Sequence, residues 1–282
     1  MVAFFGMGLL GSNFVRALRR RREEVAVWNR TPARAQLLVE AGARFFESAA
    51  EAAKGATRLH LTLKDDASVD EVLEAAKSGF SPGLVIVDHT TTSIEGAARR
   101  AKLWADRGFF YLHAPVFMGP QNALESTGRM ITSGDRAVFD KVAVALAAMT
   151  GTLKWEGPEP EKAAGIKLTG NLLFLTVVGG LRDVLGLAKS VGLSTADVSQ
   201  LLTDLNAGAL VPVRFQRILT VNHEDPSWEL VMARKDAGLM IAEAEKGGHP
   251  LAVAPAIAAV MDQSIAQGLG AQDWTVITKD VR

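Results

Sequence analysis

The sequence predicts an α/β protein in which a parallel sheet covered by helices precedes an all-helical C-terminal region. Three observations support this prediction. Short apolar runs alternate with helical patterns up to residue 155, and a glycine-rich turn separates the first run from the first helix. After residue 157 the strand signals stop and only helical patterns remain. Strands that are apolar throughout are typical of parallel sheets buried on both faces.

Composition narrows the class of protein. The chain has 282 residues, 48% of them hydrophobic, and 31 basic against 31 acidic side chains, as in a soluble protein of one large or two average domains. A net charge of zero argues against nucleic acid or a membrane surface as partner. Because cysteine is absent, redox chemistry would need a bound cofactor. The first residues lack the features of a signal peptide, so we expect a cytoplasmic protein.

The elements of the N-terminal half follow in order. Strands at residues 2–5 and 24–28 enclose a helix, which completes a βαβ unit. Thr31 suits the N-cap and Pro32 the first turn of the next helix. A capping box of Thr92 and Glu95 is expected to open a later helix. Further strands are predicted at residues 59–63, 84–88, 109–112, 130–133 and 152–155, and further helices at residues 68–76 and 94–106.

The sequence Gly157-Pro158-Glu159-Pro160-Glu161 suggests a domain boundary, so we expect domains at residues 1–157 and 158–282. The second domain should begin with one long apolar helix at residues 167–190. Charged residues interrupt this helix and flanking topogenic signals are absent, which argues against a membrane span. Shorter helices are predicted at residues 195–206, 210–219, 228–246 and 250–267.

Lys167 and Asn171 stand four residues apart, on one face of the long helix. A lysine in so apolar a helix either reaches solvent or is desolvated, and desolvation lowers its pKa towards the range of proton exchange. The alternative is a solvated lysine beside an asparagine that packs against another helix.

The glycine pattern is Gly6-Met7-Gly8-Leu9-Leu10-Gly11, between a predicted strand and a predicted helix. This context favours a Rossmann dinucleotide-binding domain over glycines in a purely structural turn. Gly6 would permit the tight turn, Gly8 the approach of a pyrophosphate, and Gly11 close packing of helix on strand.

The end of the second predicted strand favours NADP(H). An acidic residue there would bind the ribose 2′-hydroxyl group of NAD, whereas an arginine pairs with the 2′-phosphate of NADP. The chain has Asn29-Arg30-Thr31 and no acid at this point. Arg30 as an ordinary surface residue is the alternative.

These motifs together resemble the β-hydroxyacid dehydrogenase family, which includes 3-hydroxyisobutyrate and 6-phosphogluconate dehydrogenases and their imine-reductase relatives. The resemblance rests on the glycine pattern, Asn29-Arg30-Thr31, Asp88-His89-Thr90-Thr91, Lys167 with Asn171, and Lys235-Asp236. It implies a Rossmann domain, a long interdomain helix and an all-helical C-terminal domain that pairs two subunits. It also implies that Lys167 exchanges the proton of the reacting oxygen and that Asn171 helps to hold the substrate.

From these arguments we expect three sets of site residues and no metal. Lys167 and Asn171 are the expected catalytic residues. The expected cofactor-binding residues are Gly6, Met7, Gly8, Leu9, Leu10, Gly11, Asn29, Arg30, Thr31, Leu63, Thr91 and Lys235. The expected substrate-binding residues are His113, Val116, Phe117, Met118, Gly119, Trp228 and Asp236.

One motif departs from the family. Its substrate loop usually reads Asp-Ala-Pro-Val-Ser-Gly-Gly, where the serine and glycines hold a substrate carboxylate, but residues 113–119 here read His-Ala-Pro-Val-Phe-Met-Gly. Bulky side chains replace the residues that let an anion approach backbone N–H groups. A small 3-hydroxy acid is therefore in doubt. Phe117 and Met118 could instead pack under the loop, and His113 could be a structural group.

Three functions remain open from the sequence. The first is NADPH-dependent reduction of a small carbonyl such as a semialdehyde, with Lys167 as proton donor. The second is reduction of a cyclic imine, which needs no carboxylate anchor. The third is a nucleotide-binding module without catalysis. For any of them we expect a homodimer, because one small helical domain is too short to cover the long helix and the adjacent Gly179 and Gly180 permit close approach of a second helix.

Overall fold

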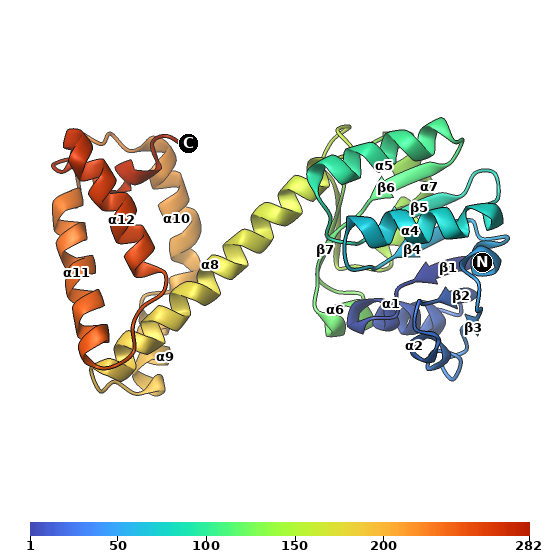
Figure 1. The fold of residues 1–282 in the computed structure, drawn as a ribbon, viewed down its shortest axis with the longest axis horizontal. Coiled ribbons are helices and arrows are strands. Elements are labelled where there is room, and N and C mark those ends of the chain that lie inside the picture. The colour runs from blue at the N-terminus through green and yellow to red at the C-terminus, as the bar shows by residue number, and fades with distance from the viewer. The chain divides into compact units, whose positions relative to one another are not determined.

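The computed structural model describes all 282 residues and divides into two compact units, residues 1–171 and 172–282. The division falls within a single long helix, α8 (Lys162–Ser190) (Figure 1). The domain limits expected from the sequence, 1–157 and 158–282, lie a few turns earlier and stay a prediction.

The first unit contains a six-stranded parallel sheet in the order β3-β2-β1-β4-β5-β6. Its strands are β1 (Val2–Phe5), β2 (Val25–Trp28), β3 (Arg44–Phe45), β4 (Arg58–Leu61), β5 (Val85–Asp88) and β6 (Phe110–His113). The register pairs Phe5 of β1 with Trp28 on one side and with Leu61 on the other, so the carboxyl ends of the three strands are level. The strand order reverses between β1 and β4, and ligands bind at such points in open α/β sheets.

Helices cover both faces of the sheet, as expected from the apolar strands. They are α1 (Leu9–Arg20), α2 (Pro32–Gln36), α3 (Ala49–Ala53), α4 (Asp66–Ala76) and α5 (Ile94–Asp106). Successive residues of β1 enter different cores: Phe4 packs in a cluster with Phe14 of α1, and Phe5 in a cluster with Leu73 of α4. The expected capping box at α5 is wrong, because Ser93 caps the helix and accepts a hydrogen bond from the Gly96 N–H group.

A second, three-stranded sheet follows. It consists of β7 (Val116–Phe117), β8 (Arg129–Thr132) and β9 (Thr152–Trp155), with β7 antiparallel to β8 and β8 parallel to β9. Helices α6 (Pro120–Glu125) and α7 (Arg136–Ala147) lie between these strands in the chain. The last two predicted strands therefore do not extend the parallel sheet. Pro115 follows β6 and has no N–H group to continue a ladder, and the next two residues pair with β8 instead.

The second unit has no strand, which confirms its predicted helical class. Besides the end of α8 it contains α9 (Thr195–Asp204), α10 (Ala207–Thr220), α11 (Leu230–Lys246) and α12 (Ala254–Ser264), followed by a short π-helix at Ile265–Leu269 and a short 3-10 helix at Trp274–Thr278. Asp183 of α8 is buried and accepts hydrogen bonds from the backbone N–H groups of residues 252, 253 and 254, before and at the start of α12. The Asp183 carboxylate thus holds the start of α12 against α8.

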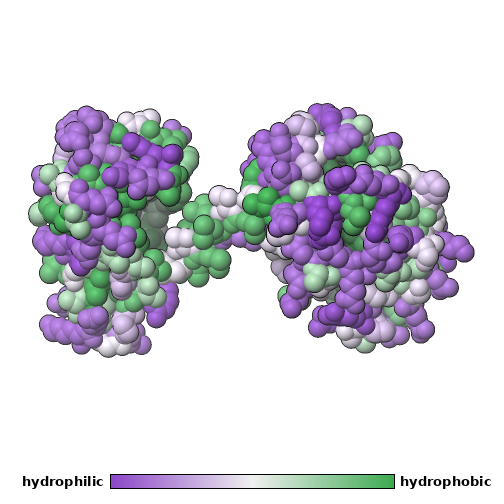
Figure 2. All heavy atoms as spheres, turned by 45° about the horizontal axis from the view of Figure 1, so that its top comes forward, coloured by the Kyte–Doolittle hydropathy of each residue, from purple (hydrophilic) through white to green (hydrophobic).

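Helix α8 begins at Lys162, five residues earlier than predicted, so Lys167 lies in its second turn. Its apolar side chains are largely exposed in the single chain: Leu172 is 64%, Leu175 72% and Val178 66% exposed. Figure 2 shows apolar residues along the surface of this helix. By length and composition alone α8 could also cross a membrane, with a mean hydropathy of 1.5. That is weak evidence, because apolar helices of soluble proteins pass the same test.

Candidate nucleotide-binding and catalytic site

The glycine loop (residues 6–11) connects β1 to α1. Gly6 has a φ of +94°, and a Cβ atom there would lie 2.2 Å from the Thr62 carbonyl oxygen. A Cβ atom on Gly11 would lie 2.0 Å from the Gly6 carbonyl oxygen. The Thr62 hydroxyl group donates a hydrogen bond to that same oxygen, at 2.7 Å. Both glycines are thus required for the close contact of α1, β1 and the end of β4.

Gly8 differs from these two glycines, because a Cβ atom there would meet no atom within 4 Å. It occupies the N-cap position of α1, where no side chain caps the helix and the first turn has no acidic residue. Unpaired N–H groups and the helix dipole favour an anion at such a position. The open space above Gly8 therefore fits the pyrophosphate of a dinucleotide.

The neighbouring loop residues have different exposures. The Met7 side chain is buried in the core and its N–H group donates to the Asn29 Oδ1 atom at 2.9 Å. Leu9 is exposed, and Leu10 packs against the core. The Asn29 amide group in turn donates to the Thr31 carbonyl oxygen at 2.9 Å. Asn29 thus ties the glycine loop to the turn after β2.

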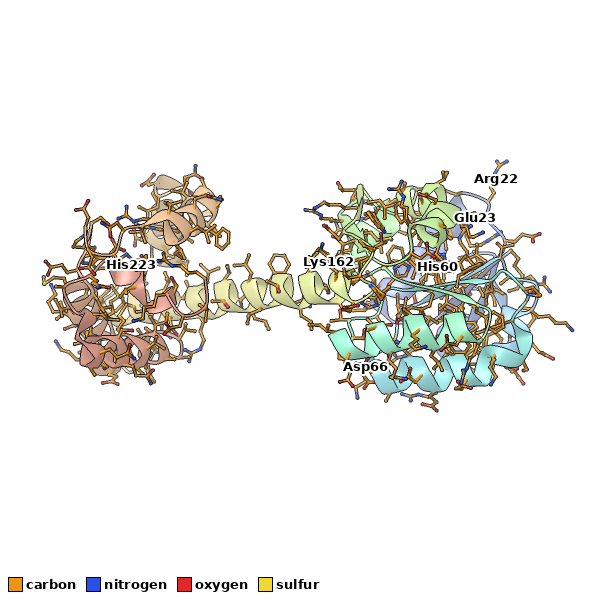
Figure 3. All side chains as sticks on the ribbon, turned by 90° about the horizontal axis from the view of Figure 1, so that it is seen from above. Arg22, Glu23, His60, Asp66, Lys162 and His223 are labelled. Carbon is orange, nitrogen blue, oxygen red and sulfur yellow. The ribbon has the colours of Figure 1, made fainter.

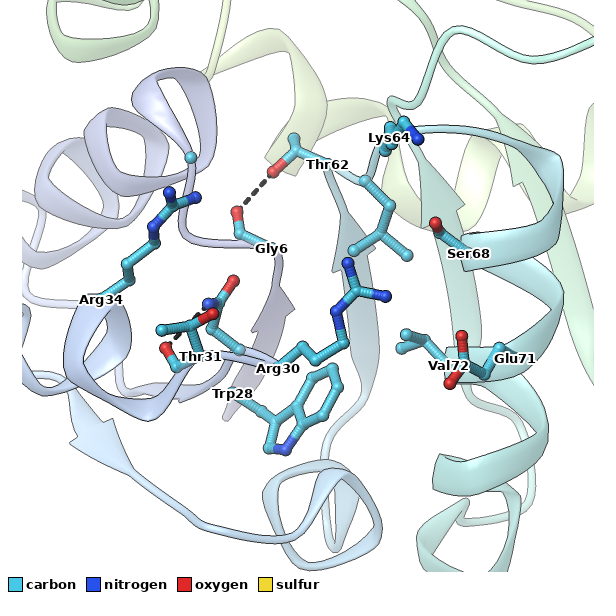
Figure 4. A pocket seen from close by; sticks show the side chains of 13 residues that line it. Gly6, Trp28, Arg30, Thr31, Arg34, Thr62, Lys64, Ser68, Glu71 and Val72 are labelled. Atoms are coloured by element: carbon cyan, nitrogen blue, oxygen red, sulfur yellow. Dashed lines mark hydrogen bonds between the residues drawn. The ribbon is translucent and has the colours of Figure 1, made fainter.

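Two pockets follow the carboxyl edge of the sheet. The first pocket, of about 290 Å³, lies between the end of β2 and α4 (Figure 4) and is lined by Gly6, Gly8, Trp28, Asn29, Arg30, Thr31, Arg34, Thr62, Leu63, Lys64, Ser68, Glu71 and Val72. The second, of about 350 Å³, is lined by Gly8, Leu9, Leu10, Gly11, Thr62, Leu63, Lys64, His89, Thr90 and Thr91. They share Gly8 and residues 62–64, at the point where the strand order reverses.

Two arginines and a hydroxyl group line the β2 side of the first pocket. Arg30, Thr31 and Arg34 are exposed, and neither guanidinium group makes an ion pair or hydrogen bond within the chain. The one acidic lining residue, Glu71, comes from α4 on the other wall (Figure 4). These groups suit a ribose 2′-phosphate.

Some lining residues are absent from the sequence-based assignment. Arg34 lies in the first turn of α2, and its place two residues after Pro32 is a signal that could have revealed it. Thr62 and Lys64 follow β4 on either side of Leu63, whose N–H group donates to the Thr90 hydroxyl group at 2.9 Å. Thr91 is exposed at the second pocket.

Lys167 and Asn171 are in direct contact. The Lys167 Nζ atom donates a hydrogen bond to the Asn171 Oδ1 atom at 2.8 Å. Desolvation lowers the pKa of Lys167 from its ordinary value. The same ammonium group lies 4.5 Å from the centroid of the Phe117 ring. The ammonium group is therefore partly desolvated and oriented by Asn171, as a general acid requires.

The substrate loop (residues 113–119) lies mostly against the core. His113 is buried, and desolvation lowers its pKa to about 4. Val116 and Met118 join the larger core cluster, with Met118 against the position where a Cβ atom of Gly128 would lie. The Gly119 N–H group donates to the Asn122 Oδ1 atom at 2.9 Å. Of the five expected residues, Phe117 is the one that the structure brings to Lys167.

The remaining expected residues belong to the second unit. Lys235 and Asp236 on α11 form an ion pair with each other at 2.8 Å. The Trp228 ring packs edge to face on Trp274, with centroids 5.7 Å apart. Their roles in binding stay predictions.

Residues 1–157 match the model of the NAD-binding domain of 6-phosphogluconate dehydrogenase. The chain belongs to this family, the β-hydroxyacid dehydrogenases. The predicted family and fold class are confirmed, and the protein is a nicotinamide dinucleotide-dependent oxidoreductase.

Several curated proteins are similar over most of the chain. An uncharacterized oxidoreductase of Bacillus subtilis is 25% identical over 285 residues, which cover 100% of this chain and 99% of that protein. One of Shewanella frigidimarina is 28% identical and covers 97% and 94% of the two chains. The human cytokine-like nuclear factor N-PAC is 29% identical over 262 residues, which are 90% of this chain but 46% of that protein.

Solved structures share the fold over the whole chain. An imine reductase of Streptomyces aurantiacus superposes with a TM-score of 0.90 at 25% identity, covering 100% of this chain and 99% of that one. A reductive aminase of Aspergillus terreus, solved in complex with NADPH4, cyclohexanone and allyl amine, gives a TM-score of 0.88 at 23% identity with the same coverage.

Proposed function

We propose that the protein is an NADPH-dependent reductase of small, uncharged carbonyl compounds, in which Lys167 donates the proton. The observation that carries this proposal is the half-buried Lys167 ammonium group, hydrogen-bonded to Asn171 and with a lowered pKa. A cofactor of this class supplies a hydride when bound. The protein must then deliver a proton to the oxygen that becomes negative.

Lys167 can perform this step because its surroundings weaken its hold on the proton. Desolvation disfavours the ammonium form, while the Asn171 amide oxygen fixes the direction of one N–H bond. The side chain remains partly exposed, so solvent can return the proton after each turnover. In the reverse direction the neutral amine would accept the proton of the hydroxyl group.

For the cofactor we propose NADP(H). Gly8 and the N-terminus of α1 would hold the pyrophosphate, and Arg30, Thr31 and Arg34 the 2′-phosphate. Support comes from the unpaired state of both guanidinium groups and from the solved relatives of the same fold that contain NADPH or NADP⁺.

An uncharged substrate is proposed because the substrate loop offers no site for a carboxylate. The Gly119 N–H group is already bonded to Asn122, and Phe117 and Met118 supply no hydroxyl group. An anionic substrate would therefore lose its hydration in the site without gaining hydrogen bonds that compensate for the loss.

Reduction of an imine is the second candidate. It is supported by the same closed loop and by the structural similarity to the imine reductase of Streptomyces aurantiacus at 25% identity. A cyclic imine tested beside an aldehyde decides between the two: a higher rate on the imine would replace the carbonyl proposal, and activity on the aldehyde alone would remove the imine.

The proton donor is tested with Lys167→Ala. We expect turnover of every accepted substrate to fall at least about a hundredfold, since general acid catalysis contributes two to four orders of magnitude, with NADPH affinity little changed. Lys162→Ala, an exposed lysine of the same helix, is the matched control. Butanal and succinic semialdehyde, which differ by a carboxylate, test the charge preference in the same assay. Near-normal turnover by Lys167→Ala, or a strong preference for the semialdehyde, would contradict the proposal.

We further propose that the enzyme acts as a homodimer in the cytoplasm. The exposed apolar surface of α8 supports the dimer, because water contact with so many large apolar side chains is unfavourable. Burial of that surface by a second copy would also explain why a protein that does not span a membrane has so apolar a helix. Recovery of the protein in detergent-free extract would support the location, and recovery only with membranes would contradict it.

A further inference from the structure

Phe117 occupies the place in the substrate loop where the family usually has a serine, and its ring lies against α8. The ring centroid is 4.5 Å from the Lys167 Nζ atom. Gly170 is the residue that makes room for it: a Cβ atom on Gly170 would lie 2.5 Å from the Phe117 Cζ atom and 2.6 Å from its Cε1 atom. Any other residue at position 170 would have to displace the ring.

We propose that Phe117 is a positioning residue that holds the Lys167 ammonium group for proton transfer, and that Gly170 exists to admit its ring. This inference rests on the proposed role of Lys167. The ammonium group is held from two sides, by the ring face through its π electrons and by the Asn171 amide oxygen through a hydrogen bond.

The contact with the Phe117 ring restricts the flexible Lys167 side chain. Lysine loses much rotamer freedom when it is fixed, and the bond to Asn171 is its single hydrogen bond within the chain. A second contact on another side of the ammonium group removes alternative rotamers. The ring also preserves the charged form, because its negative face attracts the cation in a place where burial disfavours it.

The Phe117 ring acts on the pKa of Lys167 in two opposite ways. Its π face attracts the cation and raises the pKa, whereas its cover keeps water away and lowers the pKa. Two substitutions separate these effects. Phe117→Leu keeps an apolar cover but removes the π face, so the pKa of Lys167 should fall below that of the wild type. Phe117→Ala removes cover and ring together, so water reaches the ammonium group and the pKa should rise above that of the wild type. Phe117→Tyr keeps the ring and should leave the pKa close to the wild-type value.

This pKa can be measured without turnover. Reductive methylation with ¹³C-formaldehyde labels the lysines of the folded enzyme, and the Lys167 signal is identified by its loss in Lys167→Gln. Its chemical shift is then followed against pH by NMR. Opposite displacements of the pKa in the leucine and alanine variants support the proposal. Displacements of the same sign, or none, overturn it.

A double-mutant cycle tests the role of Gly170. Gly170→Ala alone should displace the ring and lower turnover roughly two- to fivefold, the size of a cation–π contact at a partly exposed site. In the Phe117→Ala background the same substitution should have no further effect, because the clash is gone. Alanine favours the helix more than glycine does, so a weakened helix cannot explain the loss.

Gly165→Ala is the matched control, since a Cβ atom there would meet its nearest neighbour, the Ile94 Cδ1 atom, at an ordinary 3.9 Å. Equal effects of Gly170→Ala with and without Phe117 would overturn the proposal. Failure of the proton-donor assignment is distinguishable: Lys167→Ala would then keep its turnover, whereas the NMR titration would still report on the ring.

Discussion

We expect the choice between NADPH and NADH to depend on single side chains at the end of β2. Arg30 and Arg34 come from the turn after the strand and from the first turn of α2, and both lack a partner in the chain. Both arginines line the first pocket, where they can face one anion, and Asn29 fixes the turn after β2 by its hydrogen bonds with Met7 and Thr31. A 2′-hydroxyl group would leave both cations unpaired.

We expect Arg30→Ala to remove most of the preference for NADPH and Arg34→Ala to remove part of it. A hydrogen bond to a charged group contributes about 1.5–3 kcal/mol, so the loss in NADPH affinity should be roughly ten- to a hundredfold, with NADH affinity unchanged. Fluorescence or calorimetric titration measures both, and Arg20→Ala, at the exposed end of α1, is the control. Equal affinities of the wild type for the two cofactors would refute this argument.

At the scale of the strands, three histidines in or next to β4, β5 and β6 are buried, and this burial favours their neutral form. The Arg58 guanidinium group donates to the His60 Nε2 atom at 3.1 Å, and His89 Nδ1 lies 2.7 Å from the Ala114 carbonyl oxygen. Because that oxygen can only accept, His89 carries its proton on Nδ1 and accepts from His60 Nδ1–H through Nε2, at 2.9 Å. His60 lies inside the sheet unit (Figure 3).

Stability should therefore fall in mild acid. Burial lowers the pKa of His60, His89 and His113 below their ordinary value of 6.5, so the unfolded chain binds more protons. This contribution to stability is complete above pH 6.5 and is lost as the pH falls below it, by at most about 1.4 kcal/mol per pH unit for each histidine. Urea unfolding between pH 7.5 and 5 measures this slope.

His113→Phe provides the control for this slope. Neither ring nitrogen of His113 has a hydrogen-bond partner, so phenylalanine should not destabilise the protein at pH 7.5 and should remove one histidine from the slope. A stability that does not change between pH 7.5 and 5 would contradict the assignment of neutral histidines.

The sequence was a good guide to long elements and a poor one to short contacts. The other five strands of the parallel sheet have four mostly apolar residues each, which a local pattern reveals, whereas β3 and β7 have two residues each and depend on pairing partners elsewhere in the chain. The glycine loop was predictable because a turn needs its glycines locally. Gly170 was not, since the ring that requires it comes from residue 117.

At the scale of the whole molecule, the apolar surface of α8 is the feature that the single chain leaves uncovered. The helix has 29 residues, which extend over about 44 Å at 1.5 Å per residue. Several of its leucines and valines between residues 172 and 185 are more than a third exposed in the single chain. The resemblance to the family implies that a second copy of the chain covers this surface.

Gly180 offers the sharpest test of that dimer. A Cβ atom on Gly180 would meet no atom within 4 Å, so the single chain can accept a larger residue there, and leucine favours a helix more than glycine does. Gly180→Leu should therefore damage assembly and activity together only if another subunit packs on this position, by about 1–3 kcal/mol of overpacking. Lys189→Leu, which adds the same side chain near the end of α8, should leave assembly intact. Sedimentation of both variants and of the wild type at micromolar concentration measures the outcome, and an active wild-type monomer would exclude the dimer.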